Sequence, residues 1–500
     1  MTIVLACDLG GASFRAALID ETGAARAAAA RPSPVPERRG EASEIDPPLW
    51  RAALFALAGD LARAAPQAFA AIEGVALCGA TRTQVFLEAD GRPLRPAMLW
   101  DDARAEGAAR RLAARAPGHP EAAALNAFHP AARLAFLAET EPERLARLAC
   151  VLDPKDYLAA DLTGERASDP VSLARLIAAA TPDAAGVDLL AALGASPALL
   201  PPLREPWERT GDIRSGLPAP FDRLAGVPVF CGSNDTYAAV LGLGAMRAGV
   251  AYNISGTTEV LGVVGPEPMR AEGLLTVDWR GLWQLGGPSQ TGADALAWLA
   301  AILGREVGAL EALLAARRDP QPALFLPYLS GERVPHWDAG LRGAFVGLSR
   351  RHGPADLVWA ALEGVAFQNR LVLERAEART GAVHEIRFGG GGAANARWRQ
   401  IKADVCGRPI VTGAAKEPGL VGAAILAFVG LGRFASLAAA QDAMVRIAQR
   451  CEPDPARAAI YDALYARWRE AEAAIAPVSR ALAGFDAATL VAPAATEHAA

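Results

Sequence analysis

Residues 229–264 read VFCGSNDTYAAVLGLGAMRAGVAYNISGTTEVLGVV, and the patterns in this stretch decide the fold. The first pattern is an apolar run, Val227–Phe230, that leads into Gly-Ser-Asn-Asp at 232–235 and then into a helical segment. This order predicts a strand followed by a helix, with Asp235 at the junction. Open α/β sheets hold their ligands at the carboxyl ends of strands, so Asp235 is a candidate site residue.

The second pattern is a strand, a tight polar turn and a returning strand, at 251–254, 255–258 and 259–264. Gly256, Thr257 and Thr258 offer backbone N–H groups and hydroxyls to an anion, and the glycine has no Cβ to block a close approach. Glycines at 242, 244 and 249 precede this hairpin and are interpreted as a flexible joint.

The start of the chain has the same form. Thr2–Cys7 is an apolar strand, residues 8–13 form a turn with Gly10 and Ser13, and Phe14–Asp20 returns as a strand. We therefore predict two related lobes, each of which lends a phosphate-holding hairpin to one cleft. Two ordinary hairpins are the alternative, because glycine-rich turns are common. With Asp235 between the two turns, a phosphotransferase is favoured.

Composition narrows the class of protein. A chain of 500 residues is too long for one core, so two or more domains are expected. A net charge of −5 argues against nucleic-acid and membrane-surface partners. The 6 cysteines are scattered without a C-x-x-C pair, which favours reduced thiols and a cytoplasmic location over disulfides or zinc. The start of the chain has no signal-peptide pattern, and the longest apolar run, near 420–431, is too short to span a bilayer.

Periodicity predicts the other elements in outline. Helices are expected over most of 121–200 and at 47–65, 288–303, 307–316, 355–379, 419–429 and 455–474. Strands are expected at 72–78, 85–87, 323–329, 385–388 and 409–411, with a loop at 31–40. Residues 481–500 are expected to form a flexible tail.

A run of four glycines, Gly389–Gly392, follows a predicted strand and precedes a helix that begins near Asn395. Such a turn suits the close approach of a nucleotide to the backbone. The chain contains no G-x-x-x-x-G-K-[ST] sequence, which excludes a P-loop. The glycines also lack the G-x-G-x-x-G spacing, so a Rossmann dehydrogenase is a weak alternative, and a plain tight turn is another.

Two aspartates are the candidate chemical groups. Asp8 ends the first strand beside a phosphate-holding turn, where a carboxylate could orient hydrated Mg²⁺; the alternative is an Asx turn. Asp235 is the candidate general base for transfer of a phosphoryl group to an alcohol; the alternative is a helix N-cap. Trp100, Asp102 and Arg104 could hold a polyhydroxylated ligand or could be ordinary surface residues.

These motifs together resemble the FGGY carbohydrate kinases, which have a duplicated actin-like (ribonuclease H-like) α/β ATPase fold, over about residues 3–475. The resemblance lies in six segments in the family's order. They are 8–15 (DLGGASFR), 100–104 (WDDAR) with 155–164, 232–235 (GSND), 255–258 (SGTT), 343–363 and 389–404. Gly11 stands where threonine is usual in the first of them.

The resemblance implies two lobes around a central cleft, a sugar-binding lobe at 1–244 and an ATP-binding lobe at 245–480. It implies ATP and Mg²⁺, with Asp235 as catalytic base and Asp8 at the metal. The residues implied for ATP are Gly10, Ser13, Arg15, Gly256, Thr257, Thr258, Gly390, Gly391, Gly392 and Asn395. Those implied for the sugar are Thr81, Arg82, Trp100, Asp102, Arg104 and Asp235.

The branch with the best match is similar to the xylulokinases, so a pentulose such as xylulose is the first substrate hypothesis. One departure weakens it: residues 79–83 read GATRT where that branch has Gly-Gln-Met-His-Gly, and Arg82 falls at the position of a substrate-touching histidine. Ribulose, erythritol, glycerol or gluconate therefore stay open as substrates. So do a non-catalytic sugar sensor and an actin-like chaperone. A homodimer is expected from similar kinases.

Overall fold

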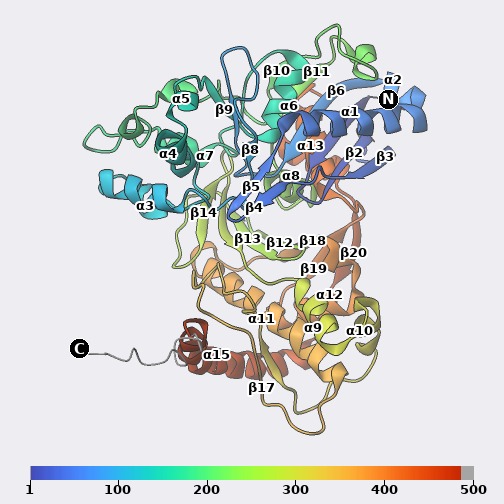
Figure 1. Ribbon diagram of the computed structural model, residues 1–500. Coiled ribbons are helices and arrows are strands. Elements are labelled where there is room, and N and C mark those ends of the chain that lie inside the picture. Colours follow the sequence, from blue (N-terminus) through green and yellow to red (C-terminus); the bar gives the residue numbers. More distant parts are fainter. Residues whose placement is uncertain (1, 486–500) are drawn as a thin grey trace, which may run out of the picture. The chain divides into compact units, whose positions relative to one another are not determined.

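The computed structural model describes residues 2–485, and these fall into two compact units. The first unit comprises residues up to Gly244 together with Glu417–Arg446, and the second comprises Ala245–Lys416 and the residues from Ile447 onward. The predicted domains, 1–244 and 245–480, did not include the return of 417–446 to the first unit. Of the predicted tail, residues 481–483 belong to helix α15 (Pro455–Ala483), and 486–500 lie outside the described residues (Figure 1).

The sheet of the first unit has six strands in the order β10-β11-β6-β1-β2-β3. Strand β1 (Ile3–Leu9) pairs antiparallel with β2 (Ser13–Asp20) and parallel with β6 (Ile72–Gly79), which pairs parallel with β11 (Pro228–Asn234). In register, Gly79 lies opposite both Leu9 and Asn234. The three parallel strands therefore end together at one edge of the sheet. The outer strands are β3 (Ala25–Pro32) and β10 (Arg209–Asp212).

The second unit repeats this pairing pattern. Strand β12 (Val250–Ser255) is antiparallel to β13 (Glu259–Gly265) and parallel to β18 (Glu385–Gly389), which is parallel to β19 (Ile410–Gly413). Three further strands complete the order β14-β15-β13-β12-β18-β19-β20: β14 (Leu275–Asp278), β15 (Trp283–Pro288) and β20 (Ile447–Cys451). The two units thus share one topology, as the two hairpins predict.

Helices and short strands complete each unit. The first unit adds α1 (Pro47–Ala64), α2 (Pro66–Ala70), α3 (Glu106–Arg115), α4 (Pro130–Thr140), α5 (Pro142–Leu145), α6 (Pro154–Thr163), α7 (Ala174–Ala179), α8 (Asp235–Gly242), α13 (Pro418–Gly430), α14 (Leu437–Met444), β4 (Glu37–Arg39), β5 (Ala42–Ile45), β7 (Val85–Leu87), β8 (Ala97–Met98) and β9 (Cys150–Leu152). The second adds α9 (Asp294–Leu303), α10 (Val307–Leu313), α11 (Pro354–Thr380), α12 (Ala396–Cys406), α15, β16 (Leu324–Leu326) and β17 (Ala344–Val346). Within residues 2–485, no helix is both long and apolar enough to cross a bilayer.

Three sequence predictions need correction. Residues 288–293 are not helical, because β15 runs to Pro288 and the helix begins only at Asp294. Gly292 there lies against the 255–258 turn: an added Cβ would be 2.6 Å from the carbonyl carbon of Thr258. Residues 121–200 hold short helices separated by β9 and irregular segments, not mostly helix. The predicted loop at 31–40 contains β4, a strand without buried residues.

Helix α13 explains why the chain returns to the first unit. It packs against α8 and against β1 and β6 (Figure 1). Two glycines permit this approach: an added Cβ at Gly242 would lie 1.8 Å from the carbonyl oxygen of Pro418, and one at Gly422 would lie 1.8 Å from that of Ala238. The two helices therefore meet backbone to backbone.

Replacing Gly422 with alanine should lower the free energy of unfolding by about 1–3 kcal/mol or more, because a Cβ in this contact forces the helices apart. Gly59→Ala is the matched control, since Gly59 lies within α1 and its added Cβ meets only the end of the Arg63 side chain at 3.4 Å. That control should gain about 0.5–1 kcal/mol. Thermal denaturation of both variants checks this, and equal midpoints would contradict the close-packing account.

A buried carboxyl group in the second unit ties two loops together. Glu332 lies between β16 and β17, and its Oε1 accepts the N–H groups of Gln290 at 2.6 Å and Arg333 at 2.7 Å. Its Oε2 is buried without a partner among the described residues. Burial raises the pKa of Glu332 to about 7. The folded unit therefore keeps this group protonated at a pH where the unfolded chain has already released the proton.

Stability should consequently fall as pH rises from about 4.5 to about 7 through this group, because the native state binds the extra proton in that window. Glu332→Gln does not titrate, so its stability relative to the wild type should grow across the window, by up to about 3 kcal/mol. Thermal denaturation at pH 5 and pH 8 measures this, with exposed Glu311→Gln as control. A constant difference between Glu332→Gln and wild type would refute the assignment.

Candidate functional site

The parallel strands of the first unit bring three predicted site segments to one edge. Asp8 is the last but one residue of β1, Asp235 directly follows β11, and Thr81–Arg82 follows β6 between them. Because Leu9, Gly79 and Asn234 are in register, all three segments leave the sheet at the same level. This is the edge at which α/β sheets hold ligands.

Asp8 carries a carboxylate that the fold does not satisfy. Its side chain is only 13% exposed, and Oδ1 is buried without a hydrogen-bond partner among the described residues. Burial first, and then the negative charge of Asp235, raise the pKa of Asp8 to about 7. Arg15 gives partial compensation, with Nη1 at 3.7 Å from Oδ2 of Asp8 and 3.1 Å from Oε2 of Glu417. The two aspartates therefore form a pair of like charges at the strand ends.

Asp235 is the first residue of α8, and its carboxylate is not the helix cap. The cap is Asn234, whose Oδ1 accepts the N–H of Tyr237 at 2.8 Å. Among residues 2–485, Oδ1 of Asp235 accepts only from its neighbour Thr236, through the backbone N–H at 2.6 Å and the hydroxyl at 3.2 Å. Burial raises the pKa of Asp235. The N-cap alternative is thus excluded, and a half-buried carboxylate is left at the sheet edge.

The strand end before Asp235 is fixed by a buried lysine. Nζ of Lys155, on α6, lies 2.5 Å from Oδ1 of Asp156 and 2.9 Å from Oδ2 of Asp169. Asp169 in turn accepts the hydroxyl of Ser233 at 2.8 Å. The sequence offers Lys155 and Asp156 as a motif, but Asp169 was missed because its partners are distant along the chain.

The first predicted phosphate turn, Gly10–Ser13, is held from behind. Ser33 donates its hydroxyl to the carbonyl of Gly10 at 2.5 Å and its N–H to the carbonyl of Ala12 at 3.1 Å. Gly11 is exposed, and a Cβ built on it would lie 4.0 Å from Nε1 of Trp100. Trp100 itself is 53% exposed. The indole therefore stands beside the turn, and a larger residue than glycine at position 11 would contact it.

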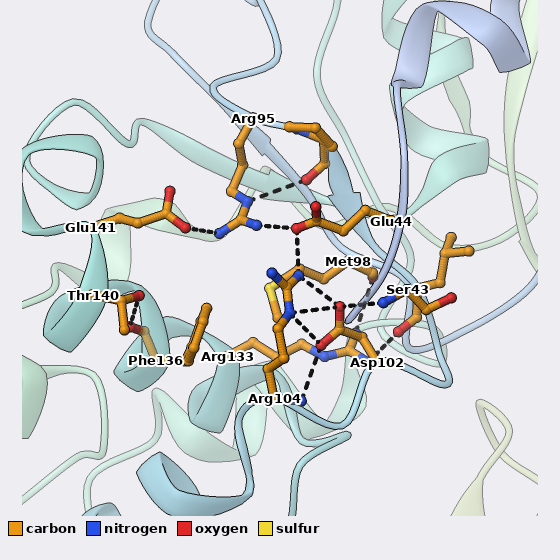
Figure 2. Close-up of polar contacts among 12 residues, drawn as sticks. Ser43, Glu44, Arg95, Met98, Asp102, Arg104, Arg133, Phe136, Thr140 and Glu141 are labelled. Atoms are coloured by element: carbon orange, nitrogen blue, oxygen red, sulfur yellow. Dashed lines mark hydrogen bonds and ion pairs between the residues drawn. The ribbon is translucent and has the colours of Figure 1, made fainter. Parts of the chain in front are cut away.

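Asp102 and Arg104 belong to an internal ion network (Figure 2). Asp102 is fully buried, accepts the N–H of Ser43 at 3.0 Å and pairs with Nη2 of Arg104 at 2.7 Å. Arg104 also contacts Glu44, which Arg95 joins to Glu141. Asp102 thus supports the loop that carries Trp100 and has no exposed surface for a ligand. Arg104 keeps part of its side chain exposed, 22%.

The second unit brings its two predicted turns together at the matching edge. Ile254 of β12 lies opposite Gly389 of β18, so both turns leave the sheet side by side. An added Cβ at Gly390, whose φ is +83°, would lie 2.2 Å from the carbonyl oxygen of Ser255, and one at Gly392 would lie 2.4 Å from its hydroxyl. A Cβ at Gly391 would meet nothing within 4 Å. Gly390 and Gly392 are therefore packing glycines, and Gly391 faces open space.

Two further residues shape this edge. Asn395 caps α12, because its Oδ1 accepts the N–H of Trp398 at 3.0 Å. Lys402 is buried behind the 255–258 turn, where Nζ lies 2.8 Å from Oδ1 of Asn253 and 3.1 Å from Oε2 of Glu259. Lys402 also contacts Asn369. This network could not be predicted from the sequence, since its members lie on four separate segments.

The donor set fits Mg²⁺ held by phosphates and water. No group of three or more His, Cys, Asp or Glu side chains within residues 2–485 could hold a metal. Mg²⁺ keeps most of its water and takes one or two carboxylates. Asp8 would fit as such a carboxylate, because its buried Oδ1 has no hydrogen-bond partner within the described part of the chain.

Comparison with known proteins agrees with this geometry. The models of the N-terminal and C-terminal domains of the FGGY family of carbohydrate kinases match residues 3–242 and 251–431. The xylulose kinase of Escherichia coli is 31% identical over 81% of this chain and 84% of its own length. The glycerol kinase of Aromatoleum aromaticum is 30% identical over 94% of this chain and 98% of its own length. A crystal structure of a xyloylose kinase from Brucella ovis superposes with a TM-score of 0.86 at 30% identity, over 95% of this chain and all of its own.

The duplicated sheet topology is therefore the actin-like, ribonuclease H-like fold of these kinases. Both family models lie within the expected span, and together they cover most of the chain. The strand ends, the two glycine turns and the comparisons lead to one conclusion: the chain belongs to the FGGY family of carbohydrate kinases, and it is a carbohydrate kinase that uses ATP.

Proposed function

We propose that the protein transfers the γ-phosphoryl group of ATP to a hydroxyl of a pentulose such as xylulose, with Asp235 as general base. The observation that supports this most is that Asp8 and Asp235 lie at the carboxyl edge of β1, β6 and β11, where Leu9, Gly79 and Asn234 are in register. Membership of a carbohydrate kinase family and 31% identity to a xylulose kinase favour the pentulose.

In this proposal, Asp235 accepts the proton of the attacking hydroxyl. An oxygen–phosphorus bond forms to the acceptor, and the bond between the γ-phosphorus and the bridging oxygen breaks to release ADP. A half-buried carboxylate with a raised pKa is a better proton acceptor than an exposed one. Because Asn234 caps the helix, Asp235 is left for this role.

Asp8 would hold Mg²⁺ through its carboxylate. The metal supplies charge neutralisation at the phosphates. Gly10, Ser13 and Arg15 in the first unit, and Gly256, Thr257 and Thr258 in the second, would hold phosphate groups through backbone N–H groups, hydroxyls and one guanidinium. Gly391 would face the nucleoside, with Gly390, Gly392 and Asn395 shaping the turn around it.

The acceptor would bind at Thr81, Arg82 and Trp100. Arg82 has five donors and no acceptor, so it suits hydroxyl oxygens or a carboxylate and cannot accept a hydroxyl proton. Arg104 would contact the acceptor through the exposed part of its side chain, and Asp102 would act indirectly by holding the loop that carries Trp100. Because a glycerol kinase is 30% identical to this chain, glycerol and other polyols are the second group of candidate substrates.

A panel experiment tests the proposal. ADP release from MgATP is measured with D-xylulose, L-xylulose, D- and L-ribulose, erythritol, glycerol and gluconate. Strong turnover with a pentulose is expected. Turnover with glycerol or gluconate alone would overturn the pentulose assignment but keep the kinase. Thermal stabilisation by a sugar without any ADP release would support the sugar sensor instead.

Asp235→Asn should lower kcat for the preferred acceptor by about 10²–10⁴, because general-base help of this kind is lost. The amide keeps the shape and the contact with Thr236, so KM for MgATP should change little. Asp222→Asn removes an exposed carboxylate of the same unit and serves as control. An Asp235→Asn enzyme that keeps most of its kcat would rule out this base.

Gly391→Ala should raise KM for ATP about tenfold or more while the thermal midpoint stays unchanged, because its Cβ enters space that the protein leaves open. Gly353→Ala, which also meets nothing within 4 Å, is the control and should alter neither quantity. If Gly391→Ala binds ATP like the wild type, the nucleoside does not lie at this turn.

A further inference from the structure

Arg133 is a buried cation whose guanidinium donates hydrogen bonds to backbone carbonyls. It lies on α4 with no exposed surface. Its Nη1 donates to the carbonyl of Arg82 at 2.5 Å, to that of Met98 at 3.2 Å and to Oε1 of Gln84 at 3.3 Å, and its Nη2 donates to the carbonyl of Leu99. In the part of the chain that the structure describes, no carboxylate lies within ion-pair distance of it. A buried charge is costly unless its donors are satisfied, and here carbonyl oxygens satisfy most of them.

The carbonyls that Arg133 holds belong to the two segments that carry the proposed acceptor-binding residues. Arg82 follows β6, and Leu99 precedes Trp100. The segments also bond directly, because Gln84 and Met98 exchange N–H···O bonds of 2.9 and 3.1 Å. The planar guanidinium on α4 therefore joins both segments at one point.

The conformation of Arg82 requires such support. Its φ is +57°, a left-handed value that a side chain with a Cβ seldom adopts. A residue in this region stays there only where its surroundings determine it. The hydrogen bond from Arg133 to the Arg82 carbonyl is a contact that fixes this peptide group. The hydrogen bond thereby fixes the backbone from which the exposed Arg82 side chain extends.

We propose that Arg133 is a positioning residue that sets acceptor selectivity by holding Arg82 in the left-handed conformation and by joining the 79–84 and 97–104 segments. This inference rests on the proposed function for its effect on the acceptor. Its structural part, the fixing of the two loops, is independent of any turnover.

Arg133→Met removes every N–H donor of the side chain while keeping a side chain of similar length. Arg133→Lys keeps the positive charge but replaces the guanidinium with a single ammonium group. Arg133→Met should raise KM for the acceptor about tenfold or more and change the ratio of kcat/KM between two acceptors, with KM for MgATP within about twofold of the wild type. Arg133→Lys should restore part of the loss. Exposed Arg110→Met on α3 is the control. A parallel rise in both KM values would overturn the proposal, because a purely structural role predicts that result.

A second background isolates the role of Arg82. Glycine adopts positive φ without strain, so in Arg82→Gly the support from Arg133 is no longer needed. Adding Arg133→Met to Arg82→Gly should change the acceptor KM less than about threefold, and a double-mutant cycle should show coupling. Additive effects of the two substitutions would contradict the proposed route through Arg82.

Amide hydrogen exchange separates this inference from the proposed function. In Arg133→Met, exchange should accelerate in peptides covering 79–84 and 97–104, while β1 and β2 exchange as in the wild type. Unchanged exchange in those peptides would refute the fixing role, even if the enzyme phosphorylates a sugar. If no acceptor is phosphorylated, the function fails, and local acceleration still supports the structural part. Should Arg133→Met not fold, the same comparison is made with Arg133→Lys.

Discussion

The in-register ending of parallel strands is the constraint on which the rest of the structure depends. Because β1, β6 and β11 stop at one level, Asp8, Arg82 and Asp235 leave the sheet together although they lie far apart along the chain. In the second unit, the parallel strands β12 and β18 also end at one level, so the turns at 255–258 and 389–392 leave the sheet side by side. In each unit, strand register thus brings the candidate site segments to one edge of the sheet.

This arrangement has an energetic cost. Burial at this edge disfavours the charged form of Asp8, and the negative charge of Asp235 adds to the effect, which is why the pKa of Asp8 rises to about 7. Each unit also has supporting groups of its own: in the first, Lys155 fixes the end of β11 and Arg133 holds the Arg82 loop, and in the second, Lys402 lies behind the 255–258 turn. Each is a buried cation that contacts the backbone or carboxylates next to a site segment.

Much of the fold could be predicted from the sequence, because strand and turn patterns are local. The two hairpins predicted the duplication of the fold, and the glycine run predicted the turn at 389–392. The return of α13 to the first unit could not be predicted, since it depends on contacts of Gly242 and Gly422 with distant backbone. For the same reason the sequence could suggest Asp102 as a sugar ligand, although its oxygens are used by Ser43 and Arg104. Whether a polar residue is available to bind a ligand therefore depends on hydrogen-bond partners that the local sequence does not reveal.

In the proposed reaction, Asp235 acts in the chemical step and does not hold the fold or the acceptor. Titration calorimetry of the acceptor into Asp235→Asn, with a non-hydrolysable ATP analogue present, measures binding, and turnover of the same variant measures the chemical step. We expect a Kd within about fivefold of the wild type together with a loss of turnover of about 10²-fold or more. Loss of binding in proportion to turnover, or turnover that survives the substitution, would contradict it.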